Sequence, residues 1–64
     1  MNKVKEYRQI AQLTQMELAT RVGIARQTVN LIENDKYNPS LSLCIALAKI
    51  LHTDLNTLFW EEEQ

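Results

Sequence analysis

The sequence contains few of the residues that staple or interrupt small domains. Its 64 residues include one cysteine, one glycine and one proline. A single cysteine excludes an internal disulfide, and Cys44 with His52 falls short of the four ligands that a structural zinc site needs. The longest apolar run, residues 43–48, is far too short to cross a bilayer. Because no basic and apolar leader opens the chain, we expect a cytoplasmic protein. The short apolar runs, the missing metal-ligand set and the lack of room for a separate ligand domain predict no membrane contact, metal, cofactor or small-molecule ligand.

The net charge is also small, −1, which at first argues against an anionic partner. The charges are unevenly distributed, however. Residues 1–36 carry six basic and four acidic side chains, whereas residues 37–64 carry one basic and four acidic side chains. The first part is therefore able to hold an anionic ligand if the acidic end points away from it. The other interpretation is a neutral domain with a solubilising tail, and charge alone leaves both open.

Apolar residues at helical spacing dominate a composition that is 45% hydrophobic. Their period predicts an all-α fold. Thr14 and Glu17 have the spacing of a capping box. Gly23 suits the left-handed conformation that ends a helix, and Ser40 is a suitable helix cap. We expect one compact domain over residues 1–64, with helices over residues 3–12, 15–22, 26–34 and 41–51 and a last short turn from 53 to 58.

The predicted fourth helix is apolar on nearly two faces, whereas a surface helix needs only one apolar stripe. At about 100° per residue, the inner stripe contains Leu41, Cys44, Ile45, Ala48 and Leu51. We expect residues 41–64 to contain a dimerisation region, made of the second stripe and the aromatic residues after it. The residues expected to contact another subunit are Leu43, Leu47, Ile50, Phe59 and Trp60. The alternative is a monomer in which this helix is central and Trp60 folds back over it.

Residues 15–34 have the length and pattern of a helix-turn-helix, in which one helix braces a second that enters the DNA major groove. The close crossing of the two helices requires a small residue, which Ala19 supplies. The sharp turn four residues later falls on Gly23. Apolar residues that lock the crossing angle occupy the inward positions: Leu18, Val22, Ile24, Val29 and Ile32.

The combination of the runs at residues 14–19, 22–29, 32–34 and 36–41 resembles the Cro/phage-repressor (xenobiotic-response-element) type of helix-turn-helix. The resemblance covers about residues 4–59 and implies a five-helix DNA-binding fold that acts as a dimer on a palindromic operator. The ending Leu58-Phe59-Trp60 with its acidic residues resembles small stand-alone members of the family. In those proteins a short C-terminal β-strand pairs across the dimer.

The resemblance also implies which side chains contact DNA. The start of the third helix faces base edges, where arginine suits guanine and glutamine suits adenine. The predicted base contacts are Arg26, Gln27, Thr28 and Asn30, although Thr28 and Asn30 also suit the backbone, and the alternative for Arg26 is a contact to a phosphate only. The start of the second helix and the loop after the third face phosphates, so the predicted phosphate contacts are Gln15, Lys36, Tyr37 and Asn38. The alternative is that Gln15 is an ordinary exposed helix residue and that the loop with Lys36, Tyr37 and Asn38 is only solvated.

Two further positions are interpreted as structural. In related domains the residues at the positions of Arg8 and Glu33 form a partly buried ion pair. We therefore expect Arg8 and Glu33 to join the first helix to the recognition unit. Three residues depart from the family pattern. Ala25 replaces a Ser or Thr cap, Asp35 replaces a common glycine and brings its charge toward the phosphates, and Leu31 stands where a polar residue is frequent. Leu31 either meets a thymine methyl group or simply lies on the surface.

The sequence predicts double-stranded DNA as the partner and a homodimeric repressor as the function, with repression by occlusion of polymerase. The alternative is an antitoxin or protein-interaction module that grips another protein through the fourth helix and the C-terminal tail. An enzyme is not expected, because the sequence shows no nucleophile with a base, no metal set and no phosphate loop.

Overall fold

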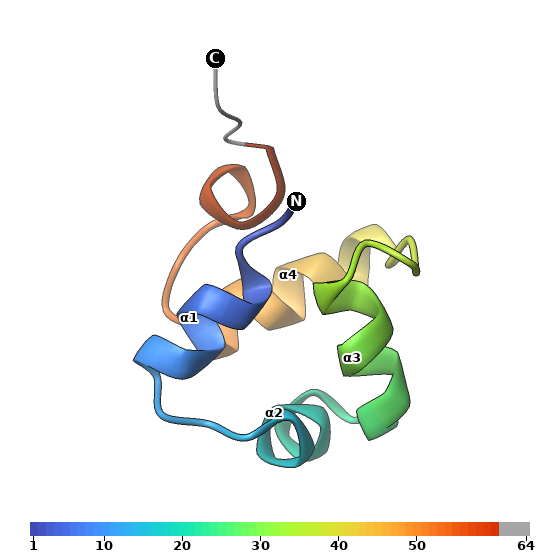
Figure 1. Cartoon of the computed structure of the whole chain (residues 1–64). Helices are drawn as coiled ribbons and strands as arrows, with labels where there is room; N and C mark the ends of the chain where they lie inside the picture. Colours follow the sequence, from blue (N-terminus) through green and yellow to red (C-terminus); the bar gives the residue numbers. More distant parts are fainter. Residues whose placement is uncertain (61–64) are drawn as a thin grey trace.

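The structure, a computed structural model, describes residues 1–60. Within them the chain forms five helices and no strand (Figure 1), namely α1 (Val4–Ile10), α2 (Gln15–Val22), α3 (Arg26–Glu33), α4 (Leu41–Ile50) and the short π-type helix η1 (Asn56–Trp60). The predicted all-α fold is confirmed, and the first four predicted helices begin and end within two residues of the observed ones. None of the helices described is long and apolar enough to cross a bilayer.

The helix starts follow the predicted capping chemistry. The Thr14 hydroxyl accepts from the Glu17 N–H at 3.0 Å, and the Thr14 N–H donates to the Glu17 carboxylate at 2.8 Å. The bond from the Thr14 N–H above all, with a smaller contribution from the Thr14 side chain, holds the pKa of the Glu17 carboxyl below its usual value. The Ser40 hydroxyl caps α4 by accepting from the Leu43 N–H at 3.2 Å. Ala25 provides no side-chain cap, so α3 begins with unpaired amides.

The helix ends share one geometry, but only one of them uses glycine. Gly23 has the expected positive φ of 89°, and the same left-handed region holds Gln12, Asp35 and His52, each two residues past a helix. A side chain there costs about 1–2 kcal/mol. A backbone bond that spans five residues closes each of these three turns: Leu13 N–H to Arg8 O at 3.1 Å, Lys36 N–H to Leu31 O at 2.8 Å, and Thr53 N–H to Ala48 O at 2.9 Å.

The hydrophobic core receives a fully buried side chain from every helix. In Figure 1 the N-terminal segment runs beside η1, and the Lys3 N–H donates to the Leu58 carbonyl at 2.9 Å. This bond ties the two ends of the described chain together over the core. The largest fully buried side chains are Val4, Leu18, Val29, Ile32, Leu47 and Leu58.

The structure covers much of the predicted partner-facing stripe of α4 within the single chain. Leu47 is 0% exposed in the single chain, and Leu43 and Ile50 are half-buried against the same core. The exposed residues of α4 come instead from the stripe assigned to the interior, with Leu41 62% and Ile45 39% exposed. Two adjacent apolar stripes look alike in the sequence, and packing on α2 decides which of them is covered.

The end of the described chain is helical. Phe59 packs partly on the core and Trp60 is 61% exposed. Leu58 to Trp60 lie in η1 and therefore form no C-terminal strand, because the Leu58 N–H bonds to the Asp54 carbonyl at 3.1 Å within the same turn. The remainder of the predicted strand and the acidic tail, residues 61–64, lie outside the described residues.

Candidate nucleic-acid interface

The α2–turn–α3 unit has the crossing that the sequence predicts. Ala19 is 1% exposed where the two helices meet, and its carbonyl accepts from both Gly23 N–H at 2.8 Å and Ile24 N–H at 3.0 Å. Val29 and Ile32 are buried on the inner face of α3. This anchoring fixes one face of α3 inward and leaves the opposite face open along an edge of the molecule (Figure 1).

The open face of α3 carries the predicted base contacts. Arg26, Gln27 and Asn30 are exposed, and Thr28 is half-buried beside them. Arg26 and Gln27 stand in the first turn, where the amides lack intrahelical partners. A row of polar donors and acceptors on a protruding helix is suited to hydrogen bonding with base edges in a major groove.

The predicted ion pair between α1 and α3 is present. The Arg8 Nε donates to the Glu33 Oε2 at 2.6 Å, and the Arg8 Nη1 donates to the Leu13 carbonyl at 2.8 Å. The side chains are only 11% and 3% exposed. Because Glu33 is the last residue of α3, this pair holds the recognition helix against α1.

Gln15 joins this buried pair to the exposed face of α3. Its Nε2 donates to the Glu33 Oε1 at 3.0 Å, which leaves its Oε1 to accept from the Arg26 Nη1 at 3.3 Å. The predicted phosphate contact is therefore also a positioning group for a predicted base contact. The sequence pattern missed this role, because Gln15 and Arg26 belong to different helices. The second proton on Nε2 stays available for a phosphate oxygen.

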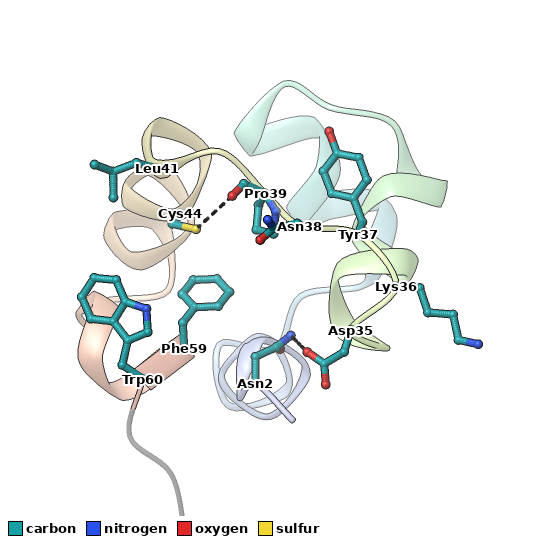
Figure 2. Close-up of a pocket in the computed structure, with 10 residues that line it drawn as sticks. All are labelled: Asn2, Asp35, Lys36, Tyr37, Asn38, Pro39, Leu41, Cys44, Phe59 and Trp60. Atoms are coloured by element: carbon teal, nitrogen blue, oxygen red, sulfur yellow. Dashed lines mark hydrogen bonds between the residues drawn. The ribbon is translucent and has the colours of Figure 1, made fainter.

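The loop after α3 presents the other predicted phosphate contacts. Lys36, Tyr37 and Asn38 are all exposed, and Figure 2 shows the Lys36 side chain directed away from the neighbouring groove. The Asp35 carboxylate is held by Asn2, whose Nδ2 donates to it at 2.8 Å. The Asp35 carboxylate, whose charge was expected to face the phosphates, therefore bonds to the N-terminal segment of the chain.

Asn2 is a positioning residue that the sequence pattern does not single out. Its Nδ2 also donates to the Ile32 carbonyl at 2.7 Å, and its Oδ1 accepts from the Val4 N–H at 3.0 Å. One amide therefore bonds to the first N–H of α1, to the C-terminal end of α3 and to the loop at Asp35. A single polar residue next to a chain end has no periodic signal that would reveal these contacts.

Comparison with known proteins decides the family. A sequence model of the helix-turn-helix family matches residues 4–58, nearly all of the described chain. The chain belongs to the helix-turn-helix family. The resemblance to the Cro/phage-repressor type is confirmed, since phage control proteins are among the relatives of this helix-turn-helix protein. It is a DNA-binding transcriptional regulator and not an enzyme.

The relatives are of similar size or larger. An uncharacterized HTH-type transcriptional regulator of Methanocaldococcus jannaschii is 42% identical over 97% of this chain and 94% of its own length. The uncharacterized HTH-type transcriptional regulator YgzD of Bacillus subtilis is 41% identical over 98% of this chain and 96% of its own. The immunity repressor protein of Bacillus phage phi105 is 37% identical over 94% of this chain but only 42% of its own length.

A groove of about 670 Å³ separates the Asp35–Asn38 loop of this helix-turn-helix protein from α4 and η1 (Figure 2). Cys44 lines it, with its Sγ 3.9 Å from the Pro39 carbonyl, and burial raises the pKa of the thiol, which makes it a poor nucleophile. Leu41 and Trp60 stand on the side of the groove formed by α4 and η1, across from Lys36 and Tyr37. Together with Ile45, one turn along α4, they form an exposed apolar surface that we call the α4 patch.

The Gln15 bridge of this helix-turn-helix protein predicts coupling between two side chains. We expect Gln15→Ala to lower the free energy of unfolding by about 1–2 kcal/mol, because the variant lacks a hydrogen bond to a buried carboxylate. We also expect Arg26→Ala to weaken specific DNA binding less in the Gln15→Ala background than in the wild type. Urea unfolding and a double-mutant cycle of DNA affinities measure the two effects. Strictly additive reductions in affinity would leave Gln15 as an independent phosphate contact.

Proposed function

We propose that this helix-turn-helix protein is a cytoplasmic homodimeric repressor that binds a palindromic operator in double-stranded DNA and occludes polymerase. The observation that carries the proposal is the open polar face of α3, with Arg26 and Gln27 at its leading end and the Arg8–Glu33 pair behind it. A rigid brace behind an exposed polar helix is what base recognition requires, because the reading side chains must be held in register.

The two leading side chains read bases in this proposal. Arg26 donates two bonds to guanine O6 and N7, and Gln27 forms a bidentate pair with adenine N6 and N7. Thr28 and Asn30 add polar contacts to bases or to the backbone. Arg26 reaches the groove already oriented by Gln15, whose Oε1 lies 3.3 Å from the Arg26 Nη1.

The phosphate contacts flank the reading face on both sides. Gln15 sits in the first turn of α2, where the helix dipole favours an anion. Lys36, Tyr37 and Asn38 supply an ammonium, a phenol and an amide from the loop beyond α3. These groups carry no base information, and they fix the orientation of α3 on the duplex.

Selection from random-sequence DNA tests the proposal. We expect an enriched palindrome with two half-sites about one helical turn apart, roughly 34 Å. Affinity for it falls as salt rises, and Lys36→Ala reduces the slope of log affinity against log salt by about 1 for each phosphate that the lysine neutralises. Lys49→Ala is the matched control, because Lys49 is an exposed lysine at the far end of α4. Failure to enrich any sequence would contradict the proposal.

The α4 patch is the surface that we assign to the dimer contact, in place of Leu43, Leu47 and Ile50. Leu41, Ile45 and Trp60 are 62%, 39% and 61% exposed, and a tryptophan beside aliphatic residues is typical of an interface anchor. The half-buried Phe59 supports Trp60 from the core side. Leu41 and Trp60 of the patch lie across the groove from the loop that carries the predicted phosphate contacts (Figure 2).

Leu41→Asp is expected to dissociate the dimer without harming the fold. Aspartate is favourable in the first turn of a helix, and Leu41 is the first residue of α4. Removing the leucine from both subunits of the interface weakens self-association by about 100-fold, which sedimentation equilibrium measures. Met16→Asp is the matched control, since Met16 is 56% exposed in the first turn of α2. A wild-type monomer that copurifies with another protein would favour the antitoxin or interaction module instead.

A further inference from the structure

Leu31 is an apolar side chain on the otherwise polar open face of α3. Its side chain is 40% exposed. Gln27 precedes it by four residues and Thr28 by three, and such spacings make helical residues neighbours on the surface. Leu31 therefore stands beside two predicted base contacts, one turn farther along the helix.

The backbone at Leu31 holds this position firmly. Its carbonyl accepts from the Lys36 N–H at 2.8 Å, in the turn that ends α3. The turn is closed at Asp35, which Asn2 fixes at 2.8 Å. These bonds constrain the backbone at Leu31, so its side chain stays exposed on the open face of α3.

The major groove offers one apolar group to such a side chain. The other groups on the base edges there are hydrogen-bond donors, acceptors or small C–H groups such as the C5–H of cytosine, whereas thymine presents its C5-methyl group. Leucine over an amino group or a ring nitrogen would remove water from it without returning a hydrogen bond, which is unfavourable. Over a methyl group both partners lose only water-exposed apolar surface.

We propose that Leu31 is a specificity-determining residue that reads the 5-methyl group of a pyrimidine in each half-site. The inference rests on the proposed function and names part of its target. The methyl group is that of thymine or of 5-methylcytosine, which place it at the same point of the groove. Cytosine and uracil at this position bind more weakly, because they leave the leucine facing an unfilled gap.

Base analogues in the selected operator isolate the methyl group. Each thymine of a half-site is replaced in turn by deoxyuridine, which lacks the methyl group and keeps every hydrogen-bonding atom. We expect one position at which the wild type binds about fourfold more weakly for each half-site changed, the effect of one buried methyl group. At that base pair, the A·T pair is also replaced by guanine paired with cytosine or with 5-methylcytosine. We expect the protein to bind the operator with 5-methylcytosine more tightly than the operator with cytosine by the same factor. This comparison separates the methyl contact from hydrogen bonding to the A·T pair.

Leu31→Ala is the test variant, and Ile10→Ala is its matched control. Ile10 is 67% exposed at the end of α1, away from the recognition face. We expect Leu31→Ala to bind thymine and uracil operators equally, whereas Ile10→Ala keeps the wild-type preference. Circular dichroism shows that both variants are folded. Specific binding with no uracil-sensitive position, or a preference that survives in Leu31→Ala, would overturn this inference alone. Absence of any specific binding would overturn the proposed function as well.

Discussion

Arg8→Met is expected to remove a large part of the free energy of unfolding of the helix-turn-helix protein. The change strands the Glu33 carboxylate, which is 3% exposed, with only the Gln15 amide as a remaining side-chain donor. Removing one partner of a buried pair costs about 3–5 kcal/mol. A domain of this size has a total stability of about 3–10 kcal/mol, so the destabilisation is of the same order as the whole. Urea unfolding followed by circular dichroism measures it.

The control for this variant is removal of both charges. Arg8→Met with Glu33→Leu leaves no unpaired charge in the interior, and we expect it to recover most of the stability of the wild type. Lys49→Met, at an exposed position of α4, controls for the removal of one positive charge. If the free energy of unfolding of Arg8→Met were within about 0.5 kcal/mol of the wild-type value, as for surface substitutions, the pair would have no structural role.

The second large effect concerns recognition and leaves stability unchanged. We expect Arg26→Ala and Gln27→Ala each to weaken binding to the selected operator by about 10- to 100-fold for each half-site, the value of one bidentate base contact. Both side chains are exposed, so neither change leaves a cavity. Binding to random-sequence DNA falls much less, since phosphate contacts remain. Electrophoretic mobility shifts with both DNAs separate the two effects.

Arg21→Ala and Gln9→Ala are the matched controls. They remove the same residue types from exposed positions in α2 and α1. We expect both to keep the preference for the selected operator over random DNA. A double variant of Arg26 and Gln27 that kept this preference would show that other side chains read the sequence, and the assignment of these two residues would be wrong.

Much of the site follows from local sequence signals. The capping box at Thr14 and the left-handed turn at Gly23 were predictable because both depend on neighbours within a few residues. Ala19 at the helix crossing was predictable because close approach demands a small side chain. These local rules place α2 and α3, and they open one face of α3.

Contacts between helices had no such signal in the residues alone. Nothing in the local pattern announced that Gln15 would bridge Glu33 and Arg26. Likewise, Asn2 reaches the end of α3 and the Asp35 loop, 30 and 33 residues away in the chain. Such bonds form only after packing has brought distant segments together.

The sequence by itself therefore determined the helices, their caps and the outward face of the recognition helix, because these depend on periodicity and on short-range hydrogen bonds. Only the tertiary structure decided which apolar stripe of α4 is covered. It buries Leu47 and leaves Leu41 and Ile45 in solvent. The physical reason is that hydrophobic burial is non-directional. Periodicity shows how many apolar faces a helix has, and the arrangement of its neighbours selects the face that is removed from water.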